Sequence, residues 1–261
     1  MSLVSTLARS VAALAAVAGL AGSLAAQGAP AFVATTWSGP SAYILDDNLN
    51  VLSSFVVNDG NPNGVAAGTQ YLYTGHFSNQ SIVAYSFAGV EQFRFSDARL
   101  GNLQGLAYVG GELAAASGTE TFFFDALTGA FTRSFVNSGF SVEGLAFHNG
   151  LLWELGDQLI GRDVMTGAVV ATLANPAANC GYGGTGLASG GAGVLVAACD
   201  AGDWYKVNDA TGALLASGNN QLDMYGLTQF AAATVPEPGS LALLGIGVFG
   251  LVSVTRRRRS A

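Results

Sequence analysis

Residues 105–135 read GLAYVGGELAAASGTETFFFDALTGAFTRSF, and this stretch decides the fold because four other parts of the chain are loose copies of it. It begins with Gly-Leu-Ala, passes through a glycine turn and two hydrophobic runs, and ends with an Asp-x-x-Thr-Gly turn and a last apolar run. The start recurs with small variations, at intervals of 41, 39, 42 and 40 residues, at Gly64, Gly105, Gly144, Gly186 and Gly226. A fixed period of this length indicates a repeat architecture.

Each repeat is expected to form four short strands. In the quoted stretch these are Gly105–Val109, Glu112–Ala116, Glu120–Asp125 and Ala130–Phe135. The aspartate of the last turn accepts hydrogen bonds from the turn backbone, and its glycine supplies a positive φ. Four strands in about 40 residues are typical of one blade of a β-propeller.

The number of blades follows from the two ends of the repeat region. Four complete units are followed by a fifth start at Gly226 that has no further strands of its own. The N-terminal part supplies three strands without a start: Phe32–Trp37, Ala42–Leu45 and Val51–Val57. We therefore predict an all-β fold, a five-bladed β-propeller of four-stranded blades over residues 31–233, closed by a blade that both ends share. A sixth, degenerate blade or an open ring is the alternative. The strands resemble the broad class of YVTN, NHL and quinoprotein-like propellers, which implies the same fold.

Both ends of the chain read as targeting segments. Residues 1–26 combine Arg9, an apolar run and small residues near Ala25 and Ala26, which predicts a cleaved signal peptide; a membrane anchor is the alternative. Residues 235–261 begin with Pro-Glu-Pro, continue with an apolar transmembrane helix expected over residues 240–255, and end with four arginines. Because positive residues stay on the cytoplasmic side, the propeller would face outward.

This C-terminal pattern resembles the PEP-CTERM sorting signal of Gram-negative bacteria. The resemblance implies an exosortase as partner, association with exopolysaccharide and biofilm production, and a membrane contact through the C-terminal helix. It also implies export, with anchoring in the inner membrane facing the periplasm before sorting, and then a place at the cell surface or outside the cell. An ordinary C-terminal anchor is the alternative. The implied sorting residues are Pro236, Glu237, Pro238, Arg256, Arg257, Arg258 and Arg259.

Charge excludes one class of partner. Between Gln27 and Val235 there are five basic and sixteen acidic residues, which leaves a net charge of −11. A domain of this charge repels phosphate backbones, so we expect no nucleic-acid partner.

The loops that precede the inner strands converge on one mouth of the propeller channel. The residues directly before the five start glycines should ring this mouth and form the candidate ligand site: Asn63, Gln104, Glu143, Thr185 and Tyr225. One carboxylate, two amides, a hydroxyl and a phenol suit a channel lined by sugar or water, and equally a polar plug.

Metal and catalytic sites find little support in the sequence. His76 is expected in a surface loop of this face and His148 in a turn of the opposite face, which disfavours a histidine metal cluster and a Ser-His-Asp triad. We predict no catalytic residue, no metal and no cofactor. A weak exception is calcium, because Asp59, Asn61 and Asn63 match half of a calcium loop, although Gln70 stands where a glutamate is needed. Asp200 to Asp203 is a weaker candidate of the same kind.

Cys180 and Cys199 are the two cysteines of the chain. They are expected on the same face of the same blade, in an oxidising compartment, which favours a disulfide over two buried thiols.

The sequence suggests two function classes. The first is a binding or structural module of the cell envelope or exopolysaccharide matrix, with polysaccharide or matrix proteins as partners. The alternative is an enzyme, a hydrolase or a glutamine-cyclotransferase-like protein, with its site near Glu143. Leu103–Leu106, Ala116–Gly118 and Glu143–Leu145 resemble segments of the plant-type glutamine cyclotransferases, which are also five-bladed propellers. The aromatic and acidic residues that surround these segments in that family are mostly missing here.

Overall fold

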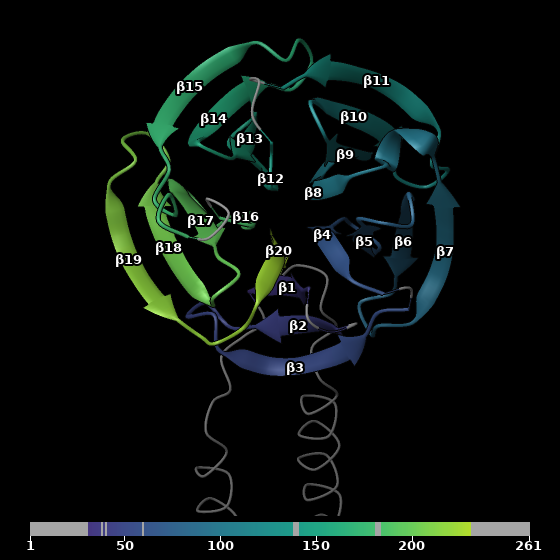
Figure 1. The fold of residues 1–261 in the computed structure, drawn as a ribbon, viewed down its shortest axis with the longest axis horizontal. Coiled ribbons are helices and arrows are strands. Elements are labelled where there is room, and N and C mark those ends of the chain that lie inside the picture. The colour runs from purple at the N-terminus through teal and green to yellow at the C-terminus, as the bar shows by residue number, and fades with distance from the viewer. Residues whose placement is uncertain are drawn as a thin grey trace, which may run out of the picture.

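The computed structural model describes residues 31–37, 39, 41–58, 60–137, 141–180 and 184–230. In this part of the chain, twenty strands form five four-stranded antiparallel sheets that surround a central axis (Figure 1). The prediction of a five-bladed, all-β propeller is confirmed. The predicted signal peptide, the C-terminal helix and the sorting residues lie outside the described residues.

The five blades are numbered in chain order. Blade 1 contains β20 (Met224–Gln229), β1 (Phe32–Thr36), β2 (Ser41–Leu45) and β3 (Val51–Val56), and blade 2 contains β4 (Pro62–Ala67), β5 (Leu72–His76), β6 (Ser81–Tyr85) and β7 (Glu91–Ser96). Blade 3 contains β8 (Leu103–Val109), β9 (Glu112–Ser117), β10 (Glu120–Asp125) and β11 (Phe131–Val136). Blade 4 contains β12 (Gly144–His148), β13 (Leu151–Leu155), β14 (Gln158–Asp163) and β15 (Val169–Ala174), and blade 5 contains β16 (Gly186–Ser189), β17 (Val194–Ala198), β18 (Asp203–Asn208) and β19 (Leu214–Asn219). A short 3₁₀ turn, η1 (Ala98–Leu100), connects blades 2 and 3.

The ring closes through blade 1, as the sequence predicts. The last strand, β20, pairs antiparallel with the first, β1, from Phe32 opposite Gln229 to Thr35 opposite Gly226. Figure 1 shows β20 on the inside of the sheet that β1, β2 and β3 continue outward. The two ends of the repeat region are therefore held together by one sheet.

The start glycines allow the inner strands of neighbouring blades to approach closely. A Cβ atom on Gly144 would lie 2.9 Å from the backbone N of Leu187, and one on Gly105 would lie 2.9 Å from the N of Leu145. Such distances are too short for any side chain, so every blade needs glycine at this position.

The Asp-x-x-Thr-Gly turns form as expected. In blade 3, Oδ1 of Asp125 accepts hydrogen bonds from the N–H and the O–H of Thr128, both at 2.8 Å, and these bonds lower the pKa of the Asp125 carboxyl. Gly129 follows with φ of 71°. The turn at the end of each third strand thus positions the outer strand.

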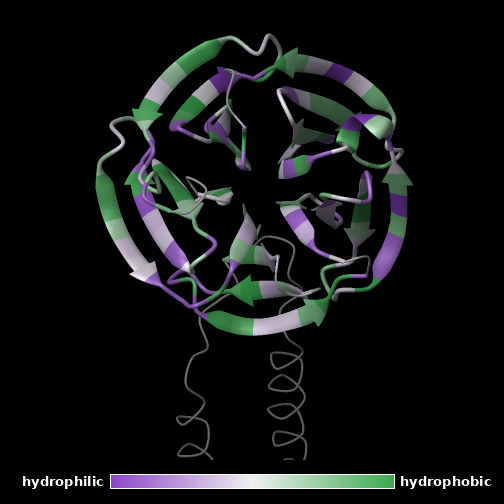
Figure 2. Cartoon of the chain, in the orientation of Figure 1, coloured by the Kyte–Doolittle hydropathy of each residue, from purple (hydrophilic) through white to green (hydrophobic). Residues whose placement is uncertain are grey.

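The core lies between the blades. The inner strands and the strands next to them are mostly buried, whereas the outermost strands are half-buried or exposed. In β7, half-buried and exposed residues alternate along the strand. Figure 2 shows bands of hydrophobic and hydrophilic residues along this outer ring of strands. This pattern is that of a sheet edge with one face toward the next blade and one toward solvent. Within residues 31–230, the described positions include no helix with the length and apolar character needed to cross a bilayer.

Candidate functional site

The propeller has two mouths, which are named here by strand direction. The inner strand of each blade begins at the upper face and ends at the lower face. At the level of the start glycines, the space between the inner strands has no room for a water molecule. The inner strands therefore pack closely around the axis at this level.

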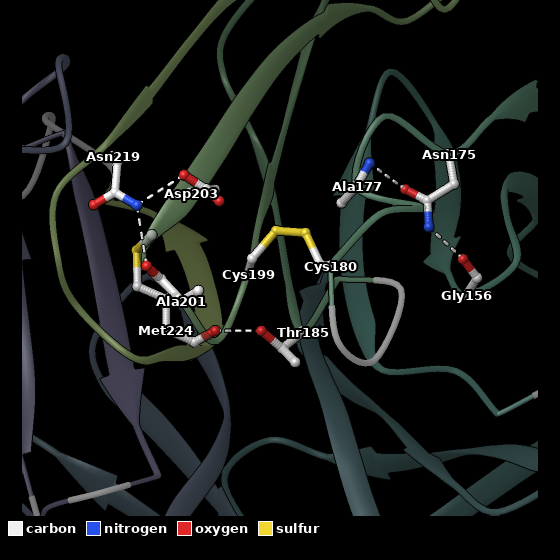
Figure 3. The surroundings of a disulfide bond; sticks show 10 residues. All are labelled: Gly156, Asn175, Ala177, Cys180, Thr185, Cys199, Ala201, Asp203, Asn219 and Met224. Carbon is white, nitrogen blue, oxygen red and sulfur yellow. Dashed lines mark hydrogen bonds between the residues drawn. A yellow bond between two sulfur atoms is a disulfide. The ribbon is translucent and has the colours of Figure 1, made fainter.

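The upper mouth brings four of the five predicted ligand residues to one opening: Gln104, Glu143, Thr185 and Tyr225. Two of the five are turned into the protein. Asn63 is buried and its amide donates to the Leu103 carbonyl at 3.4 Å, and the Thr185 hydroxyl donates to the Met224 carbonyl (Figure 3). These two side chains tie neighbouring blades together, which leaves Gln104, Glu143 and Tyr225 as the half-buried groups of the opening.

Gln104 and Glu143 form a polar pair across blades 3 and 4. The Gln104 amide donates to Oε2 of Glu143 at 2.7 Å, and its carbonyl oxygen accepts from the Ser141 hydroxyl at 2.8 Å. Burial raises the pKa of the Glu143 carboxyl, although its hydrogen bonds act in the opposite direction. The pair is therefore a preformed set of donors and acceptors.

An aromatic cluster that includes Tyr225 lies on the same, upper face. The ring of Trp37 is tilted by 34° against that of Tyr225 at 5.4 Å and meets Phe77 edge-on at 5.8 Å. Trp37 is 36% exposed. Trp37 and Phe77 were not predicted as site residues, because neither is part of a repeat motif. Each comes directly after the second strand of its blade, and this equivalent position in two repeats is the signal that could have identified them.

His76 does not lie in a surface loop, and that expectation is wrong. It ends β5 with only 1% of its surface exposed, and its Nε2 is 3.2 Å from the Thr74 hydroxyl. β5 extends one residue further than the pattern indicates, so the sheet covers the imidazole. Burial lowers the pKa of His76 to about 4.

This burial predicts acid sensitivity. Between the ordinary pKa of about 6.5 and the folded value, the unfolded chain binds a proton that the folded protein does not, so stability falls as the pH falls. We expect His76→Asn to reduce the loss of unfolding free energy between pH 7 and about pH 4.5 by about 2 kcal/mol. Urea unfolding at both pH values measures this. Equal losses in the two proteins would contradict the assignment, since the other titrating groups are common to both.

The structure joins Cys180 and Cys199 in a disulfide, with their Cα atoms 5.9 Å apart. Figure 3 shows the bond between the connection that precedes β16 and the end of β17. The same connection is held by Asn175, whose amide donates to the Gly156 carbonyl at 2.5 Å and whose side-chain oxygen accepts from Ala177 N–H at 2.7 Å. The disulfide thus fixes an upper-face loop to blade 5.

Replacing both cysteines by serine is expected to lower the free energy of unfolding by roughly 3 kcal/mol, because the bond closes a loop between residues 19 apart. For a domain of this size the melting temperature would fall by about 6–12 °C. Thermal unfolding of the variant measures the effect, and a reductant should have the same effect on the native protein. Two reactive thiols in the untreated protein would contradict the pairing.

The lower mouth contains a cavity of about 160 Å³, bounded by the ends of the inner strands. His148 lies at the lower end of β12, as the sequence predicts, but it is buried and hydrogen-bonded to Ser189 and Asp209 of blade 5. The sequence disfavours a catalytic triad and did not anticipate this hydrogen-bonded trio, which forms because the neighbouring blade supplies both partners of one histidine.

The proposed calcium loop cannot be followed as a whole, because Asp59 lies outside the described residues. Asn61 is exposed and Asn63 is buried, so the side chains of these two residues differ in their access to solvent.

Residues 234–259 match the family described as the PEP-CTERM protein-sorting motif. The chain carries a PEP-CTERM sorting motif. The match includes all seven sorting residues named from the sequence, and the motif marks exported proteins that are held in a membrane before an exosortase sorts them. A comparison with the curated proteins finds no similar sequence.

Solved structures resemble the propeller at 13% sequence identity. A glutaminyl cyclase of Myxococcus xanthus has a TM-score of 0.51, over 66% of this chain and 93% of the cyclase. The WD40 repeats of RRP9 have a TM-score of 0.50, over 75% and 65%, and a protein of unknown function from Bacteroides caccae has 0.49, over 74% and 73%. At this identity the first two likenesses support the fold alone, and the likeness to YVTN, NHL and quinoprotein-like propellers stays a prediction.

Proposed function

We propose that the exported propeller is a binding module that holds an uncharged polysaccharide of the cell surface or extracellular matrix at its upper mouth. The observation that carries this proposal is the partly exposed Trp37 ring, supported by Tyr225 and Phe77. The C–H groups of a pyranose form an apolar face that packs on an aromatic ring, and a ring held by two others loses little freedom on binding.

The polar pair supplies the second half of such a site. Sugar hydroxyls need donors and acceptors at fixed positions, and Gln104 and Glu143 offer an amide and a carboxylate that are already oriented by their mutual bond. Tyr225 lies at the same mouth as this pair, and its ring packs at a tilt against that of Trp37, so it connects the apolar and polar parts.

Charge selects the class of polysaccharide. The net charge of −11 between Gln27 and Val235 opposes the approach of uronic-acid polymers, whereas a neutral chain meets no such barrier. The sorting motif supports this role, because it marks the protein for export and the proposed polysaccharide would lie outside the cell.

Trp37→Ala is expected to weaken saccharide binding at least about tenfold, which corresponds to about 1.4 kcal/mol. The full-length protein is titrated calorimetrically with cello-, laminari- and maltohexaose, and with an alginate hexamer as the acidic comparison. We expect saturable binding of at least one neutral oligosaccharide and none of alginate.

Phe131→Ala is the matched control. Phe131 is 40% exposed and lies on β11, the outermost strand of blade 3, away from the upper mouth. Its affinity should equal that of the native protein. An equal loss in both variants would indicate unspecific contact with aromatic rings, and no binding of any oligosaccharide would contradict the proposal.

A second candidate is an enzyme with Glu143 as its acid or base. The raised pKa of this half-buried carboxyl favours it, since perturbed carboxyls in a mouth are typical of catalytic sites. The fold is also that of the Myxococcus xanthus glutaminyl cyclase. Conversion of an N-terminal glutaminyl peptide by the native protein, lost in Glu143→Gln, would support this candidate, and no conversion by the native protein would remove it.

A further inference from the structure

The lower mouth contains a hydrogen-bonded serine, histidine and aspartate from two blades. Nδ1 of His148 lies 2.8 Å from the Ser189 Oγ, and Nε2 lies 2.9 Å from Oδ2 of Asp209. The imidazole is almost fully buried, with 3% of the side chain exposed, and 15% of the Asp209 side chain is exposed. His148 ends β12, Ser189 ends β16 and Asp209 follows β18. Ser189 and Asp209 lie 41 and 61 positions after His148 in the chain.

The hydrogen bonds define where the proton lies on the imidazole. A carboxylate only accepts, so Nε2 carries the hydrogen that it donates to Asp209, and Nδ1 is left with a lone pair for the Ser189 O–H. Asp209 is itself held in place, because Asn149 donates to the same Oδ2 at 2.6 Å and the Asp209 N–H donates to the Gly193 carbonyl at 3.0 Å. Compared with the common serine hydrolases, the two ring nitrogens exchange their roles.

The serine faces usable space. Ser189 is half-buried and lines the cavity of about 160 Å³ at the lower mouth. Much of the remaining wall consists of small or apolar side chains, among them Ala67, Ala107, Ala146 and Phe147. One water needs about 10–15 Å³ by this kind of measure, so the cavity has room for a short acyl group but not for a long chain.

We propose that Ser189 is a nucleophile toward a short-chain acyl ester that enters the lower mouth. Ser189 Oγ attacks the ester carbonyl carbon, and its proton passes to Nδ1 of His148, while Asp209 stabilises the imidazolium. When the tetrahedral intermediate collapses, the bond from carbon to the alcohol oxygen breaks and the alcohol leaves with the proton from Nδ1. Water then attacks the acyl-serine through the same proton transfers and releases the carboxylic acid.

Backbone geometry next to Ser189 suits this chemistry. The N–H of Gly191 already points to Ser189 Oγ at 3.4 Å. This bond helps to hold the hydroxyl oxygen in a fixed position beside His148.

The test is labelling of the full-length protein with diisopropyl fluorophosphate, followed by mass spectrometry of its peptides. We expect one phosphoryl group per chain, on the peptide that contains Ser189, and none in Ser189→Ala. The labelling rate should fall at least about 100-fold in His148→Gln and at least about 10-fold in Asp209→Asn, because the serine loses its base or the base loses its orientation. Ser217→Ala, at an exposed serine of the same blade, should be labelled like the native protein.

Two results would overturn the proposal. One is no label on Ser189 of the native protein together with a lower melting temperature of the three variants, which would make the trio a clamp between blades 4 and 5. The other is an unchanged labelling rate in Asp209→Asn and His148→Gln, which would mean that Ser189 is merely accessible. If His148→Gln does not fold, Asp209→Asn alone decides. Hydrolysis of p-nitrophenyl acetate by the native protein but not by Ser189→Ala would extend the result from labelling to turnover.

Discussion

Gly144→Ala is expected to lower the free energy of unfolding by about 3 kcal/mol, although it adds a single methyl group. That carbon would lie 2.9 Å from the backbone N of Leu187 and 3.1 Å from the carbonyl carbon of Gly186. Both contacts are backbone atoms of the next inner strand, so relief requires blades 4 and 5 to move apart. Because the ring is closed, such a movement strains the contacts between other blades as well.

Gly101→Ala is the matched control for this experiment. Gly101 has φ of −61°, and the atoms nearest to an added Cβ are at 3.7 Å. Alanine fits there and restricts the unfolded chain, so stability should stay equal or rise by a few tenths of a kcal/mol. Urea unfolding curves of the three proteins provide the comparison. Equal midpoints for the native protein and Gly144→Ala would show that the start glycines are not needed for close packing.

Glu154→Ala is expected to cost about 3–5 kcal/mol of unfolding free energy. Glu154 is fully buried on β13, and its Oε2 lies 2.8 Å from Nε of Arg162 on β14. Burial raises the pKa of the Glu154 carboxyl in spite of this partner. Removal of the carboxylate leaves the guanidinium charge in the core without this acidic group, although its Nη1 still donates to the Gly167 carbonyl at 2.6 Å.

The exposed pair of Glu91 and Arg94 provides the comparison. The distance between their charged atoms is the same, 2.8 Å, but the Arg94 side chain is 41% exposed. Water screens such a pair, so Glu91→Ala should cost less than about 1 kcal/mol. Chemical unfolding of both variants tests whether burial, and not distance, determines the cost. Similar small losses in both would mean that blade 4 adapts to an unpaired arginine.

The repeat pattern was sufficient to predict the blade number and most strand positions. In blade 3 the predicted and observed bounds of the third strand are identical, Glu120–Asp125, because an Asp-x-x-Thr-Gly turn ends it. The shared blade was also predictable. The N-terminal part has three strands but no Gly-Leu-Ala segment, and the C-terminal part has a similar segment at Gly226 but no further strands, so together they make one four-stranded blade. The repeat pattern could not predict how far each side chain is buried. For this reason His76 was expected at the surface, whereas it is buried.

The candidate sites were less predictable because their residues come from several blades. Tyr225 was expected at the upper mouth from its place before Gly226, but its partner Trp37 belongs to no motif. Ser189 occupies the third position after Gly186, and the side chains at that position in other blades are alanine, tyrosine, phenylalanine and glutamine. The contact between the Ser189 hydroxyl and His148 forms only because blades 4 and 5 pack side by side, and the local sequence does not reveal this packing.

The most direct measurement of the central claim is a crystal structure of the protein with a bound neutral oligosaccharide. We expect a pyranose ring packed on Trp37, with hydroxyl groups within hydrogen-bond distance of Gln104 or Glu143. A saccharide bound elsewhere, or an upper mouth that stays free at saturating concentration while the solution titration shows binding, would contradict it.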